Sequence, residues 1–195
     1  MNTLSRLKLN WYDDRDTKRL IAAGEYDFIN RPEAILDLGA HKGFATEHFA
    51  QKHLCPIHAY EPNPKLYKKL VARTRKYPTV TVFNEAIAGH DGTTEFVIAE
   101  RNVSSSIFAK GKKISVPCVS LATAVARLKT ASASVKMDIE GAEFEALRVI
   151  PEAVVEIVGE VHPEKARRTE DELSKLLSRF PHVTIGEGKS IFHAV

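Results

Sequence analysis

The stretch AILDLGAHKGFATEHFA, residues 34–50, decides the fold. Apolar residues run into Asp37, two glycines (Gly39 and Gly43) bracket a short turn, and a helical pattern follows. A strand that enters a helix through a glycine turn is the opening unit of the nucleotide-binding α/β folds. The stretch therefore predicts such a fold. The acidic residue before the glycines, Asp37, helps to indicate which nucleotide cofactor is bound.

Strand and helix patterns alternate after this stretch. We expect helices over 44–53, 64–76, 142–149 and 169–179, and strands within 56–64, 79–89, 90–100, 112–121, 134–141 and 154–162. Residues 182–195 predict two short strands joined by Gly186-Glu187-Gly188, and so short a link makes that pair antiparallel. Repeated βαβ units predict a doubly wound, mainly parallel sheet.

The chain is expected to form one domain at residues 34–195, preceded by an N-terminal helical extension or lid at residues 1–33. In the extension, a helix is predicted over 14–23, ended by Gly24. Between two of the later strands, the polar residues 101–113 predict a loop that includes Ser104, Ser105 and Ser106, which can close over a cofactor or simply be flexible.

The composition, 44% hydrophobic and 27% charged over 195 residues, is ordinary for a globular domain. No apolar run approaches the ~20 residues that span a bilayer, and the first residues do not resemble a secretory signal. Cys55 and Cys118 have no ligand-like spacing. Reduced thiols and a cytoplasmic location without a membrane segment are therefore expected.

The formal net charge is only +3, but the basic residues gather in two runs. These are Lys65, Lys68, Lys69, Arg73, Arg75 and Lys76 in one segment, and Lys110, Lys112 and Lys113 in another. The runs are interpreted as solvated faces, and phosphate-binding footprints for a nucleic acid are the alternative.

Each predicted parallel strand ends in an acid. The strand ends are Asp37-Leu38-Gly39, Glu61-Pro62-Asn63, Asn84-Glu85-Ala86, Asp138-Ile139-Glu140 and Glu160-Val161-His162. Doubly wound sheets bind ligands beyond the carboxyl ends of their strands. Five acidic strand ends on one sheet therefore predict a ligand site at that edge.

The acid Asp37 indicates which cofactor this site takes. In a dinucleotide-binding turn, the glycines and the helix N-terminus hold a pyrophosphate, and a carboxylate beside it would repel that group. A carboxylate attracts cations instead, and S-adenosylmethionine carries an ammonium and a sulfonium. Glu61, at the end of the next strand, stands where an acid takes ribose hydroxyls.

The segments ILDLGAHKGFAT, AYEPNP, NEAIAGHDGTTEF and VKMDIEGAE resemble the FkbM-type family of class I S-adenosylmethionine-dependent methyltransferases. The resemblance covers about residues 34–162. It implies a Rossmann-like, mainly parallel seven-stranded sheet with an antiparallel edge strand, in a three-layer α/β/α arrangement. It also implies S-adenosylmethionine as the cofactor.

The resemblance further implies the positions that contact the cofactor. The turn around its methionine part would be formed by Asp37, Gly39, Ala40, His41 and Gly43, where Gly43 lets the helix begin close to the ligand. Glu61 would hold the ribose, with Pro62 and Asn63 beside the adenosine. Glu85 and Ala86 fall where such enzymes contact adenine, and Asp138 falls near the methyl group. An Asn is more usual at His41.

Catalytic candidates lie at the ends of the later strands. A histidine near its ordinary pKa is a natural general base at neutral pH, so His162 is the first candidate, with Asp138 and Lys136 beside it. Lys136 and His162 also have structural interpretations: a buried lysine paired with a neighbouring acid, and a hydrogen-bonded histidine at a strand end. No metal ligands are assigned. A divalent ion held by Asp138, Glu160 and His162 is the alternative.

These features predict a methyltransferase that methylates a hydroxyl of a small molecule or sugar. Three alternatives stay open: an RNA or protein methyltransferase that uses the basic runs, an NAD-binding oxidoreductase, and a non-catalytic domain that binds the cofactor.

Overall fold

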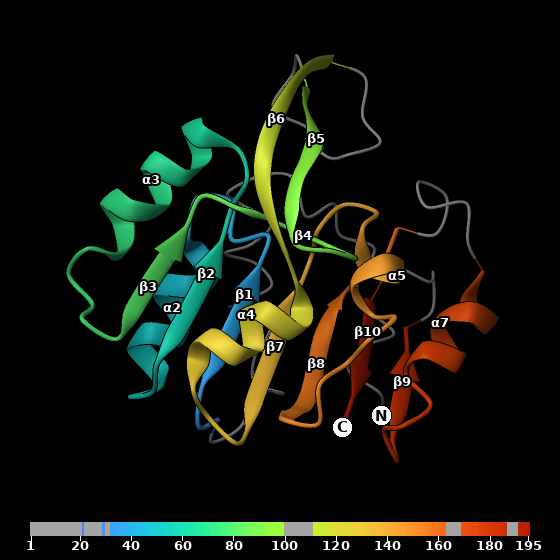
Figure 1. Ribbon diagram of the computed structural model, residues 1–195. Coiled ribbons are helices and arrows are strands. Elements are labelled where there is room, and N and C mark those ends of the chain that lie inside the picture. The colour runs from blue at the N-terminus through green and yellow to red at the C-terminus, as the bar shows by residue number, and fades with distance from the viewer. Residues whose placement is uncertain (1–20, 22–28, 30–31, 100–110, 163–168, 187–190) are drawn as a thin grey trace.

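The computed structural model describes residues 21, 29, 32–99, 111–162, 169–186 and 191–195 (Figure 1). The extension predicted at residues 1–33 and the serine-rich part of the loop predicted at 101–113 lie almost wholly outside these residues. Ile29 is fully buried in a core cluster, with Ile21 packed against it, so the extension contributes apolar side chains to the domain.

The centre of the molecule is a seven-stranded sheet in the order β3-β2-β1-β7-β8-β10-β9. Its parallel strands are β1 (Ile35–Leu38), β2 (Ile57–Tyr60), β3 (Val80–Phe83), β7 (Ala133–Met137) and β8 (Val154–Glu160). The chain winds outward from β1 to β3 and then returns to β7 on the other side of β1. The switch point between β1 and β7 is where a doubly wound sheet binds its ligand.

The antiparallel strand is β10 (Ile191–Ala194), which lies next to the edge of the sheet. It pairs antiparallel with β8 and with β9 (Val183–Ile185), the outermost strand. The predicted terminal antiparallel pair and the mainly parallel seven-stranded sheet are confirmed.

Helices cover both faces of the sheet (Figure 1). Alternate side chains of β1 enter two different cores: Leu36 and Leu38 pack with the helices α4 (Leu121–Leu128), α5 (Glu143–Ala146) and α7 (Glu170–Leu176). On the opposite face, Ile35 packs with Phe49 of α2 (Phe44–Lys52), and α3 (Pro64–Thr74) contacts α2. All four residues of β1 are buried, and because side chains alternate along a strand, the sheet is covered on both faces at this strand, which gives the three layers.

The segment 79–89, predicted as one strand, forms two. After β3 the chain leaves the central sheet because the Asn84 side chain donates to the carbonyl oxygens of Glu61 (2.7 Å) and Pro62 (3.1 Å). The strand β4 (Ala86–Ala88) then joins β5 (Gly92–Ala99) and β6 (Gly111–Ser120) in a separate three-stranded sheet, order β4-β6-β5. The loop predicted at 101–113 and the strand predicted at 112–121 overlap, and residues 111–113 belong to the strand as the start of β6.

Two helices differ from the prediction. The helix α4 was not predicted; Ser120 caps it, accepting from the backbone N–H of Thr123 at 3.2 Å. The helix predicted over 142–149 is the short α5, followed by a turn. In the described part of the chain, no helix has the length and apolar character needed to cross a membrane.

Candidate active site

The glycine turn after β1 lies directly on the end of β7. Gly39 has a φ of 77°, and a Cβ at this position would lie 1.8 Å from the carbonyl oxygen of Asp138. The backbone N–H groups of Gly39 and Ala40 both donate to the carbonyl oxygen of Tyr60, at 3.1 and 2.9 Å. The turn therefore requires glycine, and its first two donors bind β2 rather than face a pyrophosphate.

The next residue of the turn explains why His41 can replace the more usual Asn. His41 has a φ of 54°, in the left-handed region that Asn, Asp and His adopt more readily than other residues with a side chain. In this conformation its backbone N–H donates to Glu61 Oε2 at 2.8 Å. The substitution keeps the backbone geometry on which that contact depends.

Glu61 is a buried carboxylate held at both oxygens. Its Oε1 accepts from the backbone N–H of Asn63 at 2.8 Å, opposite the His41 bond to Oε2. Only 5% of the residue is exposed. Burial raises the pKa of Glu61 to about 7, although the two backbone N–H groups and Lys136 favour the ionised form. Each oxygen keeps a second lone pair, which a hydroxyl group can use.

Asp37 does not present a bare negative charge. Its Oδ1 lies 3.1 Å from Lys136 Nζ, and its Oδ2 accepts from the Thr46 hydroxyl at 2.5 Å. Asp37 and Lys136 are direct partners in the β1–β7 register, and both are buried. The ammonium of Lys136 therefore weakens the repulsion of a phosphate that was argued from Asp37 alone.

Lys136 adopts the paired arrangement that the sequence left open. Besides Asp37, its ammonium donates to the carbonyl oxygens of Gly39 (2.8 Å) and Leu38 (3.4 Å). Burial opposes the charge, but Asp37 and Asp138 more than compensate, and the pKa of Lys136 is raised. This geometry makes Lys136 a positioning residue for the glycine turn.

The other predicted cofactor positions are distributed around this edge. A Cβ at Gly43 would lie 2.7 Å from Cδ1 of Leu70 on α3. The absence of a side chain at Gly43 therefore lets α2 and α3 approach each other. Asn63 caps α3 by accepting from the backbone N–H of Lys65, and the Pro62 carbonyl accepts from Asn84. Their contacts with the cofactor stay predictions.

Of the two predicted adenine positions, Glu85 lies on the connection from β3 to β4 and Ala86 is the first residue of β4. Glu85 forms an ion pair with Arg127 of α4, and Ala86 is buried in the core of the three-stranded sheet. The contact of these two residues with adenine also stays a prediction.

Four carboxylates surround His162 at the ends of β7 and β8. Its Nδ1 lies 3.1 Å from Glu143 Oε1, and its Nε2 lies 3.4 Å from Glu140 Oε2 and 3.8 Å from Glu160 Oε1. A carboxylate of Asp138 completes the group, close to Glu140 and His162. We call Asp138, Glu140, Glu143, Glu160 and His162 the acid–histidine cluster.

Glu143 organises this cluster. Its Oε1 accepts not only from His162 but also from the backbone N–H groups of Gly141 (3.0 Å) and Ile139 (3.3 Å). These bonds hold Glu140 at a φ of 59° in the loop between β7 and α5. Glu143 was not among the candidates from the sequence. The sequence signal for this role is an acidic residue in the first turn of a predicted helix, because its carboxylate can accept hydrogen bonds from backbone N–H groups that precede the helix.

Charges in the cluster shift its pKa values. Burial disfavours the imidazolium, but the bond to Glu143 and the surrounding carboxylates raise the pKa of His162 to about 9. Burial raises the pKa of both Asp138 and Glu160. This raised pKa does not fit the premise, used to name His162 a general base, that its pKa is near the ordinary value.

The fold has known counterparts among methyltransferases. Fibrillarin in its complex with Nop5p is 17% identical, with a TM-score of 0.52, over 91% of this chain and 81% of that one. Precorrin-6y C5,15-methyltransferase from Geobacter metallireducens is 13% identical, with a TM-score of 0.50, over 97% and 91%. Aeropyrum pernix fibrillarin, which holds S-adenosylmethionine, is 10% identical, with a TM-score of 0.50, over 85% and 67%.

The sheet order, the glycine turn and the buried acid after β2 define a Rossmann-like, class I methyltransferase domain. No curated protein matches the chain in sequence. Residues 37–182 match the family described as Methyltransferase FkbM domain. The chain belongs to this family of S-adenosylmethionine-dependent methyltransferases, as the motifs of the sequence predicted, and S-adenosylmethionine is its cofactor.

Proposed function

We propose that this methyltransferase transfers its methyl group to a hydroxyl oxygen of a small molecule or sugar. The observation that carries the proposal is the acid–histidine cluster, which lies at the ends of β7 and β8, next to the switch point of the sheet. Methylation of a hydroxyl needs a group that takes up a proton, and clustered carboxylates serve that purpose.

The cofactor residues fit the group that the family implies. Glu61 offers two hydrogen-bonded carboxylate oxygens whose remaining lone pairs suit the two ribose hydroxyls. The turn at Gly39 to His41, braced by Tyr60, Glu61 and Lys136, would hold the methionine part. S-adenosylmethionine supplies an electrophilic methyl group on a sulfonium sulfur.

The residues of this chain have two tasks in the reaction. They orient the acceptor so that its oxygen attacks the methyl carbon in line as the carbon–sulfur bond breaks, and they receive the hydroxyl proton. In the proposal the cluster does both, with Asp138 closest to the turn because its carbonyl lies under Gly39.

The test begins with calorimetric titration of the full chain with S-adenosylhomocysteine, with NAD for comparison. Micromolar binding of the first and none of the second is expected. A screen of sugars and small alcohols with radiolabelled cofactor then identifies the acceptor class. Binding of the cofactor without transfer to any hydroxyl would favour the non-catalytic alternative, and binding of NAD alone would contradict the proposal.

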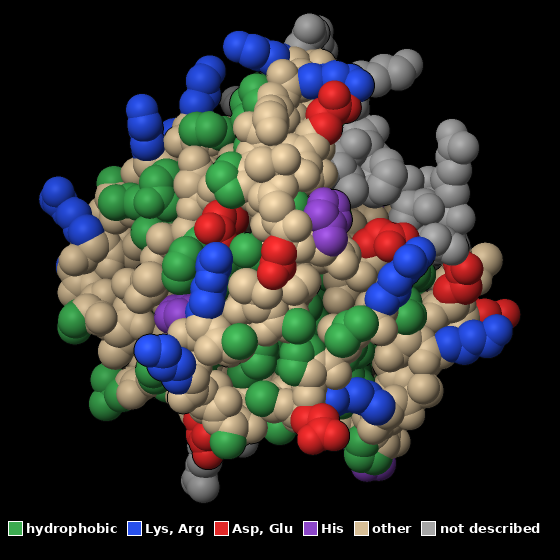
Figure 2. Space-filling view, viewed as in Figure 1, with side chains coloured by type: hydrophobic (Ala, Val, Ile, Leu, Met, Phe, Trp, Pro, Cys, Tyr) green, Lys and Arg blue, Asp and Glu red, His purple; other side chains and the backbone are tan. Residues whose placement is uncertain are grey.

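A second candidate is methylation of RNA or another polyanion, favoured by a depression of about 670 Å³ beside the glycine turn. Lys42, Lys69, Arg73, Arg75 and Lys76 line it together with Glu47. Figure 2 shows further Lys and Arg side chains over α3 and over the ends of β5 and β6.

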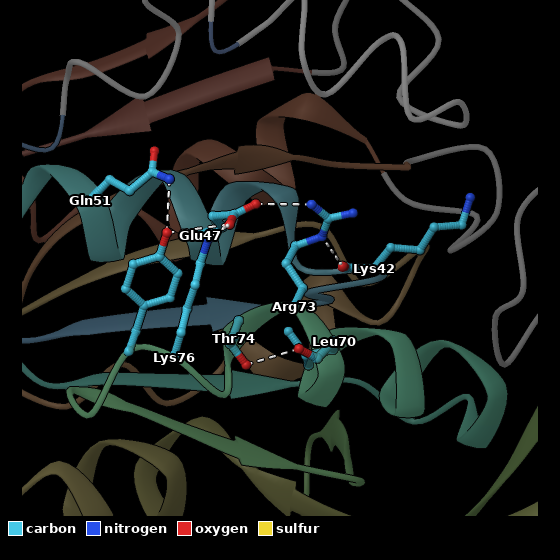
Figure 3. A network of polar contacts seen from close by, with 8 residues as sticks. Lys42, Glu47, Gln51, Leu70, Arg73, Thr74 and Lys76 are labelled. Atoms are coloured by element: carbon cyan, nitrogen blue, oxygen red, sulfur yellow. Dashed lines mark hydrogen bonds and ion pairs between the residues drawn. The ribbon is translucent and has the colours of Figure 1, made fainter.

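A single carboxylate compensates part of the positive charge in this depression. Glu47 pairs with Arg73 at 2.9 Å and with Lys76 at 3.0 Å, and Arg73 also donates to the Lys42 carbonyl (Figure 3). Because Arg73 and Lys76 already have a partner within the protein, the depression supports a polyanion less strongly than the acid–histidine cluster supports a hydroxyl acceptor. Methyl transfer that falls steeply with salt would reverse that order.

The two cysteines are buried and free, which supports the cytoplasmic location that we also propose.

A further inference from the structure

The acid–histidine cluster has the composition and spacing of a metal site. One ligand atom each from Asp138, Glu140 and His162 lies within 4.8 Å of the other two. The residues come from two segments that the β7–β8 pairing brings together. A cation with bonds of about 2.1 Å holds adjacent ligands roughly 3 Å apart and opposite ones roughly 4 Å apart, so these side chains need only a small contraction.

Independent of this spacing, two buried oxygens in the cluster call for a partner. Glu160 is 7% exposed and lies with Oε1 3.8 Å from His162 Nε2, and its Oε2 has no hydrogen-bond partner among the described residues. The Asp138 Oδ1 atom is likewise buried without a partner in the described part of the chain. Buried carboxylate oxygens are rarely left in this state, because each loses its hydration without a replacement.

We infer that Asp138, Glu140 and His162, with Glu160 beside them, bind one divalent cation of the Mg²⁺ or Mn²⁺ type. Carboxylate oxygens are the preferred ligands of these hard ions, and Mn²⁺ also accepts an imidazole nitrogen. The ion would give the oxygens of Asp138 and Glu160 that have no hydrogen-bond partner among the described residues a ligand to bind.

Glu143 supports this assignment because it occupies the place of an outer carboxylate. It lies at Nδ1 of His162, and a carboxylate there fixes the ring with the proton on Nδ1 and directs Nε2 toward Glu140 and Glu160. Metal-bound histidines usually donate their second N–H to a carboxylate or a carbonyl in this manner. The three bonds to Glu143 Oε1 also fix the loop that carries Glu140.

The role of the ion rests on the proposed function. Bound at the ends of β7 and β8, it would hold the acceptor hydroxyl and lower its pKa, so that the proton passes to a carboxylate of the acid–histidine cluster before or during attack on the methyl carbon. His162 would then be a ligand of the ion. Binding of the ion itself requires neither the cofactor nor an acceptor.

The experiment is a Mn²⁺ titration of the full chain after treatment with EDTA and dialysis, followed by the electron paramagnetic resonance signal of free Mn²⁺ at pH 7.5. One ion per chain is expected to bind. Glu140→Gln and Asp138→Asn should each weaken binding at least 10-fold. Glu145→Gln is the matched control, since Glu145 lies on α5 but pairs with Arg148 at 2.9 Å.

Circular dichroism shows whether each variant folds, and Mn²⁺ should raise the Tm of the wild type but not that of a folded Glu140→Gln variant. The inference is overturned if the wild type binds no Mn²⁺ at 1 mM with or without S-adenosylhomocysteine, or if both folded variants bind it as well as Glu145→Gln. If one variant fails to fold, the Mn²⁺ affinity of the other variant and the number of ions bound by the wild type test the inference.

The two proposals fail separately. Stoichiometric Mn²⁺ binding without methyl transfer to any hydroxyl would overturn the proposed acceptor class and leave the cation site. If the protein binds no Mn²⁺ and still transfers methyl to a hydroxyl in the presence of EDTA, the cation site is overturned and the proposed acceptor class stands.

Discussion

The ion pair between Lys136 and Asp37 offers the sharpest test of how the cofactor turn is held. Lys136→Met keeps most of the side-chain volume but removes the ammonium 3.1 Å from Asp37 Oδ1 and its bond to the Gly39 carbonyl at 2.8 Å. The side chains of Lys136 and Asp37 are only 4% and 0% exposed, so water cannot replace the lost charge.

The expected magnitude follows from that burial. Removing one partner of a buried ion pair leaves an uncompensated charge and destabilises a protein by about 3–5 kcal/mol. Net stabilities are about 5–15 kcal/mol, so the variant should fold but unfold at much lower denaturant. For a chain of this length the Tm should fall by roughly 6–20 °C.

The assay is urea unfolding at pH 7.5, followed by circular dichroism, for Lys136→Met, Asp37→Asn and the double variant. The double variant removes both charges of this ion pair, so it should be less destabilised than the sum of the single variants. A loss below about 1 kcal/mol in Lys136→Met, or strict additivity of the two changes, would refute the reasoning.

Glu61→Ala should weaken S-adenosylhomocysteine binding about 10- to 100-fold, because charge-assisted bonds to the ribose worth roughly 1.5–3 kcal/mol are lost. Since the pKa of Glu61 is about 7 and the ionised form accepts the hydroxyl bonds, wild-type affinity should be highest above pH 8 and fall as the pH drops through 7. Calorimetry from pH 5.5 to 8.5 checks this, and a flat profile would contradict it. Gly39→Ala should prevent folding or cofactor binding, because its Cβ would meet the Asp138 carbonyl at 1.8 Å, whereas Gly89→Ala, whose nearest contact is 3.4 Å, should be tolerated in thermal unfolding. His162→Ala should leave cofactor affinity within about twofold and reduce turnover at least tenfold; equal turnover would remove His162 from the site.

The sequence by itself determined the parts of this protein that depend on local pattern. The apolar run into Asp37 and the glycines after it predicted a buried strand, a tight turn and a helix, all of which are present. Alternation of strands and helices predicted the parallel sheet, and Glu61 at the end of the second strand was identified before its two backbone bonds were known. Each of these signals lies within about 30 residues of sequence and needs no knowledge of strand order.

The tertiary structure alone decided which of these residues meet. Asp37 and Lys136 face each other because β7 lies next to β1 in a particular register, and His162 meets Glu143 because β8 lies next to β7. The departure of the chain from the sheet after β3 likewise depends on Asn84 reaching the carbonyls at the end of β2. Contacts between residues distant in sequence depend on strand order and register, which local propensities do not specify. The contacts at the strand ends, and the pKa shifts that they cause, therefore arise only in the folded sheet.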